Sequence, residues 1–218
     1  TATLLEHALK GAASAGAETK IVHLYDLGYK GCISCFACKL KSGESFGRCA
    51  VKDDLAPVLN EINEVGALIL GSPIYFGDVT GEMRSFLERL FFPKPIYEPD
   101  ILSTLPKKVR TAWIYTMNLT EELAKEMGYE RMFKNNKALL ERFFGPCESL
   151  MCYDTLQFDD YSKYAARKFD EKAKRKRHEE IFPKDCERAF ELGVRLVKIN
   201  RNVNGRRRCQ HQSHKQRP

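Results

Sequence analysis

The sequence predicts an α/β fold in which helices cover both faces of a doubly wound parallel sheet. Short apolar runs alternate with amphipathic segments along the chain, and this order is typical of strand–helix units. One such run, residues 67–70, lies between Gly66 and Gly71, and its length and composition suit a strand buried on both faces. A chain of 218 residues is long enough for one such domain with a full core.

The elements follow in chain order from these patterns. Strands are predicted at residues 21–25, 67–70, 109–115 and 150–156. Helices are predicted at residues 2–15, from Asp53 or Asp54 to residue 62, from Thr80 to residue 90, from Thr120 to residue 127, and at residues 131–144, 159–181 and 184–198. Four prolines keep residues 93–107 out of regular structure.

Capping residues set several helix limits. Thr80 and Thr120 each precede apolar residues at helical spacing, so their hydroxyls suit the N-cap position. Gly16 stands at the end of the first helix, and Gly145 with Pro146 ends the helix at 131–144.

We expect three parts along the chain. Residues 1–158 form the domain, residues 159–199 form a C-terminal helical extension packed on or near it, and residues 200–218 form a basic, disordered tail. The net charge of +7 arises mainly in residues 201–218, which hold six Lys or Arg and no acid. The rest has 30 basic and 29 acidic residues, a net charge of +1, so we expect no nucleic-acid partner.

Charge and hydropathy also bear on membranes and on the compartment. The basic run at 172–177 suits either an exposed helix face or a patch for nucleic acid or membrane, and its acidic neighbours favour the exposed face. No apolar stretch approaches the roughly 20 residues of a spanning helix, and we expect neither a signal peptide nor a membrane partner. Eight cysteines, three of them in one CxxCxxC motif, favour metal or redox chemistry in the cytoplasm.

The segment after the 67–70 strand has the composition of a binding loop. Glycines permit close backbone approach, proline stiffens the turn, and two aromatic side chains suit a flat ligand. The residues concerned are Ser72, Pro73, Ile74, Tyr75, Phe76 and Gly77. Spacing alone leaves an alternative open, an ordinary strand–helix turn with two core aromatics.

Four cysteines form the second candidate site. Cys32, Cys35, Cys38 and Cys49 have the spacing Cys-x2-Cys-x2-Cys-x10-Cys, which can turn three sulfurs onto one centre. A [4Fe–4S] cluster, a zinc site and free or redox-active thiols remain alternatives, although zinc usually draws on two separated pairs. Because loops that follow parallel strands emerge at one edge, we expect this loop, the 72–77 loop and residues 116–118 to converge.

The segment GSPIYFGDVTGEMRSFLERL closely resembles the flavin loop of the NAD(P)H-dependent FMN reductase superfamily, which has the flavodoxin-like fold. The resemblance implies that residues 72–77 line the isoalloxazine ring of FMN and that Thr116, Met117 and Asn118 also touch the flavin. In that family a first strand and a phosphate loop precede the first helix, and Thr1 matches the end of that loop. We therefore expect a fragment that lacks this strand and most of the phosphate site.

The cysteine loop resembles that of the iron–sulfur flavoproteins in the same superfamily, where the last spacing is shorter. The resemblance implies an FMN-dependent oxidoreductase that takes hydride from NAD(P)H and passes electrons to a quinone-like, aromatic or protein acceptor. No catalytic side chain is required, because the flavin and the nicotinamide carry the chemistry. The alternatives are an electron carrier without its own turnover and a cluster-bearing sensor. Relatives pair their subunits, so a homodimer or homotetramer is expected.

Overall fold

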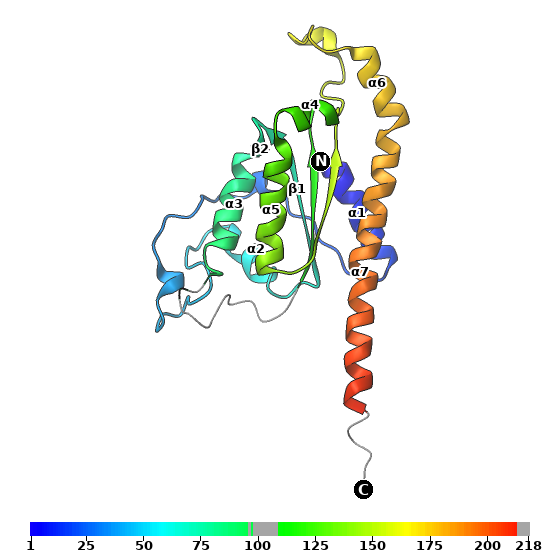
Figure 1. Cartoon of the computed structure of the whole chain (residues 1–218). Helices are drawn as coiled ribbons and strands as arrows, with labels where there is room; N and C mark the ends of the chain where they lie inside the picture. The colour runs from blue at the N-terminus through cyan, green and yellow to red at the C-terminus, as the bar shows by residue number, and fades with distance from the viewer. Residues whose placement is uncertain (96, 98–108, 213–218) are drawn as a thin grey trace. The chain divides into compact units, whose positions relative to one another are not determined.

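The computed structural model describes residues 1–95, 97 and 109–212, with side chains up to residue 198 (Figure 1). Contacts divide the chain into two compact units. Residues Val22–Gln157 form one unit, and Thr1–Ile21 form the other together with the chain from Phe158 onward.

In the part of Val22–Gln157 that the structure describes, the strands form a four-stranded sheet with the order β2-β1-β3-β4. Its strands are β1 (Ala67–Tyr75), β2 (Asp78–Val79), β3 (Arg110–Thr116) and β4 (Cys147–Cys152). Strand β3 pairs in parallel with β1 and with β4, and β2 pairs antiparallel with the end of β1. The predicted α/β architecture with a parallel sheet is confirmed.

The described residues of this unit form four α-helices: α2 (Leu55–Glu61), α3 (Gly81–Phe91), α4 (Glu121–Glu126) and α5 (Tyr129–Phe143). Both predicted threonine caps are present. The Thr80 hydroxyl accepts the Met83 N–H at 3.3 Å, and the Thr120 hydroxyl accepts the Leu123 N–H at 3.3 Å. These bonds satisfy amide groups that have no partner within the helix.

The hydrophobic core of the unit joins helix side chains to the sheet. Trp113 and Tyr115 of β3 stack with ring centroids 5.0 Å apart, and Tyr115 lies 4.8 Å from the ring of Phe133 in α5. Helix α3 buries Phe86, Leu87 and Leu90, three residues of its predicted apolar stripe.

Residues 21–25 do not form the predicted strand. Residues 21–23 have no regular structure, and Leu24–Asp26 form a short 3-10 helix, η1. A strand requires a hydrogen-bonded neighbour, and in the described part of the chain the second edge of β1 is paired only by β2 at Ile74 and Tyr75. The apolar pattern at 21–25 was therefore not sufficient to predict a strand.

Two strand limits also differ from the prediction. Strand β4 begins at Cys147 and ends at Cys152, whereas residues 150–156 were expected. Strand β1 continues past residue 70 to Tyr75, because its parallel ladder with β3 extends to Pro73 and its hairpin with β2 to Tyr75. The predicted loop at 72–77 is thus mostly strand.

The second unit contains α1 (Ala2–Ser14), α6 (Glu171–Glu180), α7 (Phe182–Gln212) and a 3-10 helix, η3 (Tyr161–Lys163). Helix α6 covers only part of the range predicted as helical at 159–181. Helix α7 continues to Gln212, where disorder was predicted from residue 200, because extending a formed helix adds one hydrogen bond for each residue ordered. Residues 213–218 lie outside the described part.

Helices α1 and α7 pack against each other at two glycines. A Cβ atom on Gly11 would lie 1.9 Å from the Phe190 carbonyl oxygen, and one on Gly193 would lie 1.8 Å from that of Ala8. Only a residue without a side chain allows this backbone approach.

Two further expectations concern the rest of the chain. Residues 93–95 and 97 are neither helix nor strand, as predicted, and the remainder of 93–107 is outside the description. Within the described helices, none is both long enough and apolar enough to span a bilayer.

We predict that Gly11→Ala or Gly193→Ala destabilises the protein by about 1–3 kcal/mol, since the added methyl groups must push the two helices apart. Gly81→Ala is the matched control, because a Cβ there has nothing within 4 Å. Urea unfolding followed by circular dichroism measures both effects. Equal stability of all three variants would contradict the close packing.

Candidate functional site

The first candidate site is a tight hairpin between β1 and β2. Ile74 pairs with Val79 and Tyr75 pairs with Asp78, so only Phe76 and Gly77 form the turn. Their φ angles are 51° and 85°. Positive φ at both central residues is the mark of a type I′ turn, in which Asn or Asp usually precedes Gly. A phenylalanine here is strained, which is a feature typical of functional sites.

The aromatic side chains of this hairpin face solvent. Phe76 is fully exposed and Tyr75 is 57% exposed. They are therefore not the core aromatics of the alternative interpretation. An aromatic surface at the tip of a short hairpin offers a platform for a flat, partly apolar ligand.

Ser72 supports the hairpin from inside. Its hydroxyl accepts the Thr80 N–H at 3.1 Å and donates to the Pro73 carbonyl oxygen at 2.8 Å. The residue is 1% exposed. Its hydrogen bond to Thr80 links the hairpin to the start of α3. Pro73 and Ile74 are half-buried strand residues beside it.

The end of β3 lies next to this hairpin. Thr116 pairs with Pro73 in the parallel ladder, so residues 116–118 leave the sheet at the same edge as the hairpin. Thr116 and Met117 are buried, whereas Asn118 is half-buried and donates from Nδ2 to Gln157 Oε1 at 2.9 Å. The predicted meeting of these two segments is confirmed.

The loop after β4 completes this edge and was not predicted. Asp154 has a φ of 50°, its N–H donates to the Leu119 carbonyl oxygen at 2.7 Å, and the Thr155 N–H donates to that of Met117 at 3.0 Å. These bonds join the loops after β3 and β4. The sequence analysis assigned residues 150–156 to a strand and therefore did not predict this turn.

Thr1 belongs to the other compact unit, where it is the N-cap residue of α1. Its carbonyl oxygen accepts the Leu5 N–H at 3.1 Å, and its side chain makes no capping hydrogen bond. Its predicted role at a phosphate group stays a prediction.

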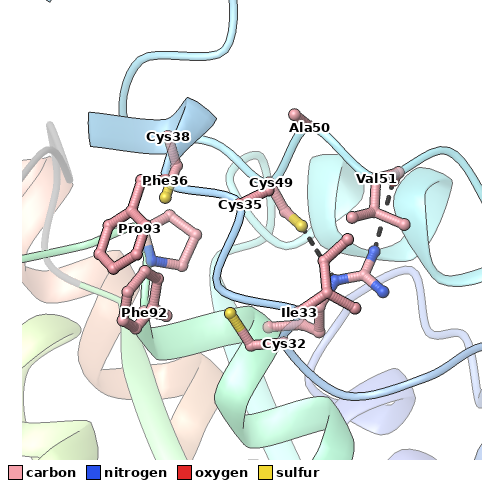
Figure 2. A pocket seen from close by; sticks show the side chains of 11 residues that line it. Cys32, Ile33, Cys35, Phe36, Cys38, Cys49, Ala50, Val51, Phe92 and Pro93 are labelled. Atoms are coloured by element: carbon pink, nitrogen blue, oxygen red, sulfur yellow. Dashed lines mark hydrogen bonds between the residues drawn. The ribbon is translucent and has the colours of Figure 1, made fainter. Parts of the chain in front are cut away.

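The second candidate site is a pocket formed around the cysteine loop (Figure 2). All four predicted cysteines line it, together with one charged side chain and several apolar ones. The lining consists of Cys32, Ile33, Cys35, Phe36, Cys38, Cys49, Ala50, Val51, Arg89, Phe92 and Pro93. The return across ten residues is made by a compact turn, in which the Gly47 N–H donates to the Cys38 carbonyl oxygen at 2.9 Å.

The cysteine pocket and the hairpin lie at opposite ends of α3. Thr80 caps the end of α3 next to the hairpin, whereas Arg89, Phe92 and Pro93 line the pocket at the other end. In Figure 1 the hairpin, marked by β2, and the blue cysteine loop lie beyond different ends of α3. The predicted convergence of the cysteine loop with the sheet edge is therefore wrong.

The course of residues 29–32 gives the reason. The Tyr29 hydroxyl donates to the Glu82 carbonyl oxygen at 2.6 Å, and the Cys32 N–H donates to Glu88 Oε2 at 3.0 Å. This segment thus runs alongside α3 from its first turn to its last. Because no strand forms at 21–25, the cysteine loop does not start from the carboxyl edge of the sheet.

The buried guanidinium of Arg89 organises the pocket. It binds the Asp53 carboxylate through two hydrogen bonds, Nη1 to Oδ2 at 2.8 Å and Nη2 to Oδ1 at 3.1 Å. It also donates to the carbonyl oxygens of Lys30 and Val51 and to Cys49 Sγ. One side chain of α3 thereby holds Lys30, Cys49 and Val51 of the loop and Asp53, which lies two residues before the start of α2.

The four sulfurs do not form a metal site as arranged. In the part of the chain that the structure describes, no three His, Cys, Asp or Glu side chains converge closely enough to hold a metal ion. Cys35 is exposed and Cys38 is buried, and burial raises the pKa of the Cys38 thiol. The thiol chemistry suits a cluster but this arrangement does not, so the metal assignment of Cys32, Cys35, Cys38 and Cys49 stays a prediction.

Sequence reasoning missed Arg89 and the main role of Asp53. Arg89 stands between Glu88 and Leu90 on a helix whose stripe is apolar, and the sequence analysis assigned it no role. Its position among Phe86, Leu90 and the buried face was the available signal. Asp53 was considered only as a cap, and it does accept the Leu55 N–H at 3.2 Å.

Residues 1–104, just under half of the chain, match the family model described as NADPH-dependent FMN reductase. This confirms the family resemblance for that segment. An iron–sulfur flavoprotein of Archaeoglobus fulgidus is 39% identical over 89 residues, 41% of this chain and 41% of that protein. One of Methanocaldococcus jannaschii is 35% identical over 89 residues, 41% of this chain and 44% of that protein. The chain spans less than half the length of these curated relatives.

A solved structure extends the fold comparison beyond the matched segment. An NAD(P)H:quinone oxidoreductase from Methanothermobacter marburgensis superposes with a TM-score of 0.60 at 14% identity, covering 89% of this chain and 90% of that one. At this identity the likeness concerns the fold. The flavodoxin-like α/β fold expected from the sequence is confirmed.

We predict that Asp53→Asn destabilises the protein by about 3 kcal/mol at pH 7, because it leaves the buried guanidinium without its counter-charge. The Arg89 side chain lowers the pKa of Asp53. This contribution is therefore complete above the unfolded-state pKa, near 4, and is lost as the pH falls through the folded-state value. The difference in unfolding free energy between Asp53→Asn and wild type should therefore become smaller below about pH 4.

The matched control is Asp54→Asn, which changes an exposed carboxylate that accepts only the Gly28 N–H among the bonds described. Its effect should stay below about 1 kcal/mol. Denaturant unfolding at pH 7 and pH 3 compares the variants. If Asp53→Asn lowers the unfolding free energy by the same amount at both pH values, the result would contradict the ion pair.

Proposed function

We propose that this chain is part of an FMN-dependent oxidoreductase that takes hydride from NAD(P)H and passes electrons to a quinone-like, aromatic or protein acceptor. The observation that carries the proposal is the strained, exposed Tyr75–Phe76 hairpin at the carboxyl edge of the parallel sheet. In doubly wound folds ligands bind at this edge. The family match over residues 1–104 supports FMN as the ligand.

The residues at this edge fit a flavin ring. Tyr75 and Phe76 offer exposed aromatic surface, and Gly77 lets the backbone approach a ring closely because it carries no side chain. Met117 lies beneath the edge as a buried apolar contact, and Asn118 offers amide donors. Bound FMN would supply hydride acceptance and electron transfer to the acceptor.

The protein groups orient the reactants and exclude water, so we propose no catalytic side chain. Ser72, Pro73 and Ile74 support the hairpin through the strand and the Ser72 hydroxyl. Thr1, at the first turn of α1, is proposed for the phosphate group, because helix N-termini bind anions.

The second candidate is an electron carrier without substrate turnover of its own. The pocket with four cysteine side chains and the iron–sulfur names of the curated relatives favour it. A cluster at these cysteines, a homodimeric or homotetrameric assembly and a cytoplasmic location remain proposals.

We predict that Phe76→Ala weakens FMN binding by about ten-fold, or roughly 1.4 kcal/mol, since it removes a preformed stacking surface. Quenching of flavin fluorescence during titration of the full-length protein measures the affinity. Phe46→Ala is the matched control, an exposed aromatic in the cysteine loop, and should bind as wild type does. Unchanged affinity in Phe76→Ala would place the flavin elsewhere.

Steady-state assays decide between the two candidate functions. With FMN bound, the oxidoreductase should oxidise NADPH or NADH in the presence of menadione. The carrier should not oxidise either nucleotide with any small acceptor, although chemical reductants would still reduce it. Nicotinamide oxidation that Phe76→Ala leaves untouched would argue against the hairpin as the reacting site.

A further inference from the structure

A third aromatic ring lies against the turn of the hairpin. A Cβ atom on Gly77 would lie 3.5 Å from Cε1 and 3.9 Å from Cζ of Tyr129, the first residue of α5. Cζ carries the phenol hydroxyl, so the hydroxyl end of the ring is the part closest to the turn. The hairpin and the start of α5 therefore contribute to one surface, although they lie far apart in the sequence.

The connection between α4 and α5 places this ring. Helix α4 follows β3 in the chain, and Gly128 joins α4 to α5 with a φ of 76°. The Gly128 N–H donates to the Lys125 carbonyl oxygen at 2.9 Å, which ends α4 and lets α5 start in a new direction. Figure 1 shows β2, α4 and the start of α5 at the same end of the sheet. The chain thus returns at Tyr129 to the carboxyl edge.

The Tyr129 hydroxyl is available to a ligand. The side chain is half-buried, and its ring packs against the hydrophobic core of the unit. Among the described residues its hydroxyl has no hydrogen-bond partner. Tyr29 of the same unit differs, because its hydroxyl donates to the Glu82 carbonyl oxygen at 2.6 Å. A phenol whose ring is held by packing and whose hydroxyl is unpaired suits hydrogen bonding to a bound molecule.

The charged groups next to the turn interact with each other. Asp78 follows Gly77, and its Oδ2 lies 3.8 Å from Nη2 of Arg84 on α3. Asp78 Oδ1 accepts the Val79 N–H at 2.8 Å. Tyr129 adds an uncharged donor beside the exposed aromatic side chains. Such a donor suits a flat ring that carries carbonyl oxygens and ring nitrogens, as an isoalloxazine does.

We propose that Tyr129 is a further residue of the flavin site and that its hydroxyl donates a hydrogen bond to an oxygen or nitrogen acceptor of the isoalloxazine ring. The inference rests on the proposed function, because it takes FMN as the ligand of the hairpin. Reduction adds electron density to the ring, and hydrogen bonds to charged acceptors are about twice as strong as those to neutral ones. Tyr129 therefore stabilises the reduced ring more than the oxidised ring and raises the reduction potential of bound FMN.

The test removes the hydroxyl and keeps the ring. Tyr129→Phe in the full-length protein should bind oxidised FMN about three-fold more weakly, as measured by quenching of flavin fluorescence. Its loss of affinity for reduced FMN should be about ten-fold larger, which corresponds to a reduction potential about 30 mV lower than that of wild type. Anaerobic equilibration of the FMN-loaded protein with a reference dye measures this potential. A purely structural role of Tyr129 would weaken both oxidation states equally and leave the potential unchanged.

Tyr97→Phe is the matched control. It removes the hydroxyl of a tyrosine that is 74% exposed and whose ring centroid lies 5.2 Å from Nζ of Lys39 in the cysteine loop. Its FMN affinity and its reduction potential should equal those of wild type. Circular dichroism verifies that both variants are folded.

The outcomes separate this inference from the proposed function. If Phe76→Ala weakens FMN binding while Tyr129→Phe keeps the affinity and the potential of wild type, the role of Tyr129 is overturned and the proposed function stands. Weaker binding in Tyr129→Phe with an unchanged or higher potential would also overturn that role, since the side chain would then act through packing. If wild type does not bind FMN, or Phe76→Ala binds it as tightly as wild type, the proposed function fails and the role of Tyr129 fails with it.

Discussion

The ion pair between Arg89 and Asp53 is the interaction on which the rest of the Val22–Gln157 unit depends. It joins α3, which follows the hairpin, to Asp53, two residues before α2, and the same guanidinium also binds the cysteine loop at Lys30, Cys49 and Val51. Two further bonds strengthen the same junction, from Lys39 Nζ to the Phe92 carbonyl oxygen and from the Cys32 N–H to Glu88. A loop without regular strands or long helices is thereby given a definite shape by side chains of one helix.

This junction also determines how the two candidate sites are related. Helix α3 has 11 residues, which corresponds to a length of about 16 Å, and the sites lie beyond its two ends. The two candidate sites therefore do not share one pocket. The aromatic hairpin and the thiol pocket are formed by different residues. A substitution in one site therefore does not contact the other site directly.

Much of the fold followed from local sequence patterns. The apolar run at β1, the stripe of α3 and the caps Thr80 and Thr120 depend on residues close in sequence, and all were predicted. The strand expected at 21–25 was wrong because strand formation depends on a distant neighbour. Arg89 and the position of the cysteine loop were missed for the same reason, since the partners of a buried charge are tens of residues away.

The strained turn at Phe76 has a consequence for how this protein can change. A bulky residue in the left-handed region costs on the order of 1–3 kcal/mol, whereas Asn or Gly fits a type I′ turn without strain. Selection for thermal stability alone would therefore replace Phe76 with Asn or Gly. This change would remove one of the two exposed aromatic side chains of the hairpin. At this hairpin, greater stability and the proposed binding surface are thus in direct conflict, and variants evolved only for heat resistance should reveal that conflict first at this position.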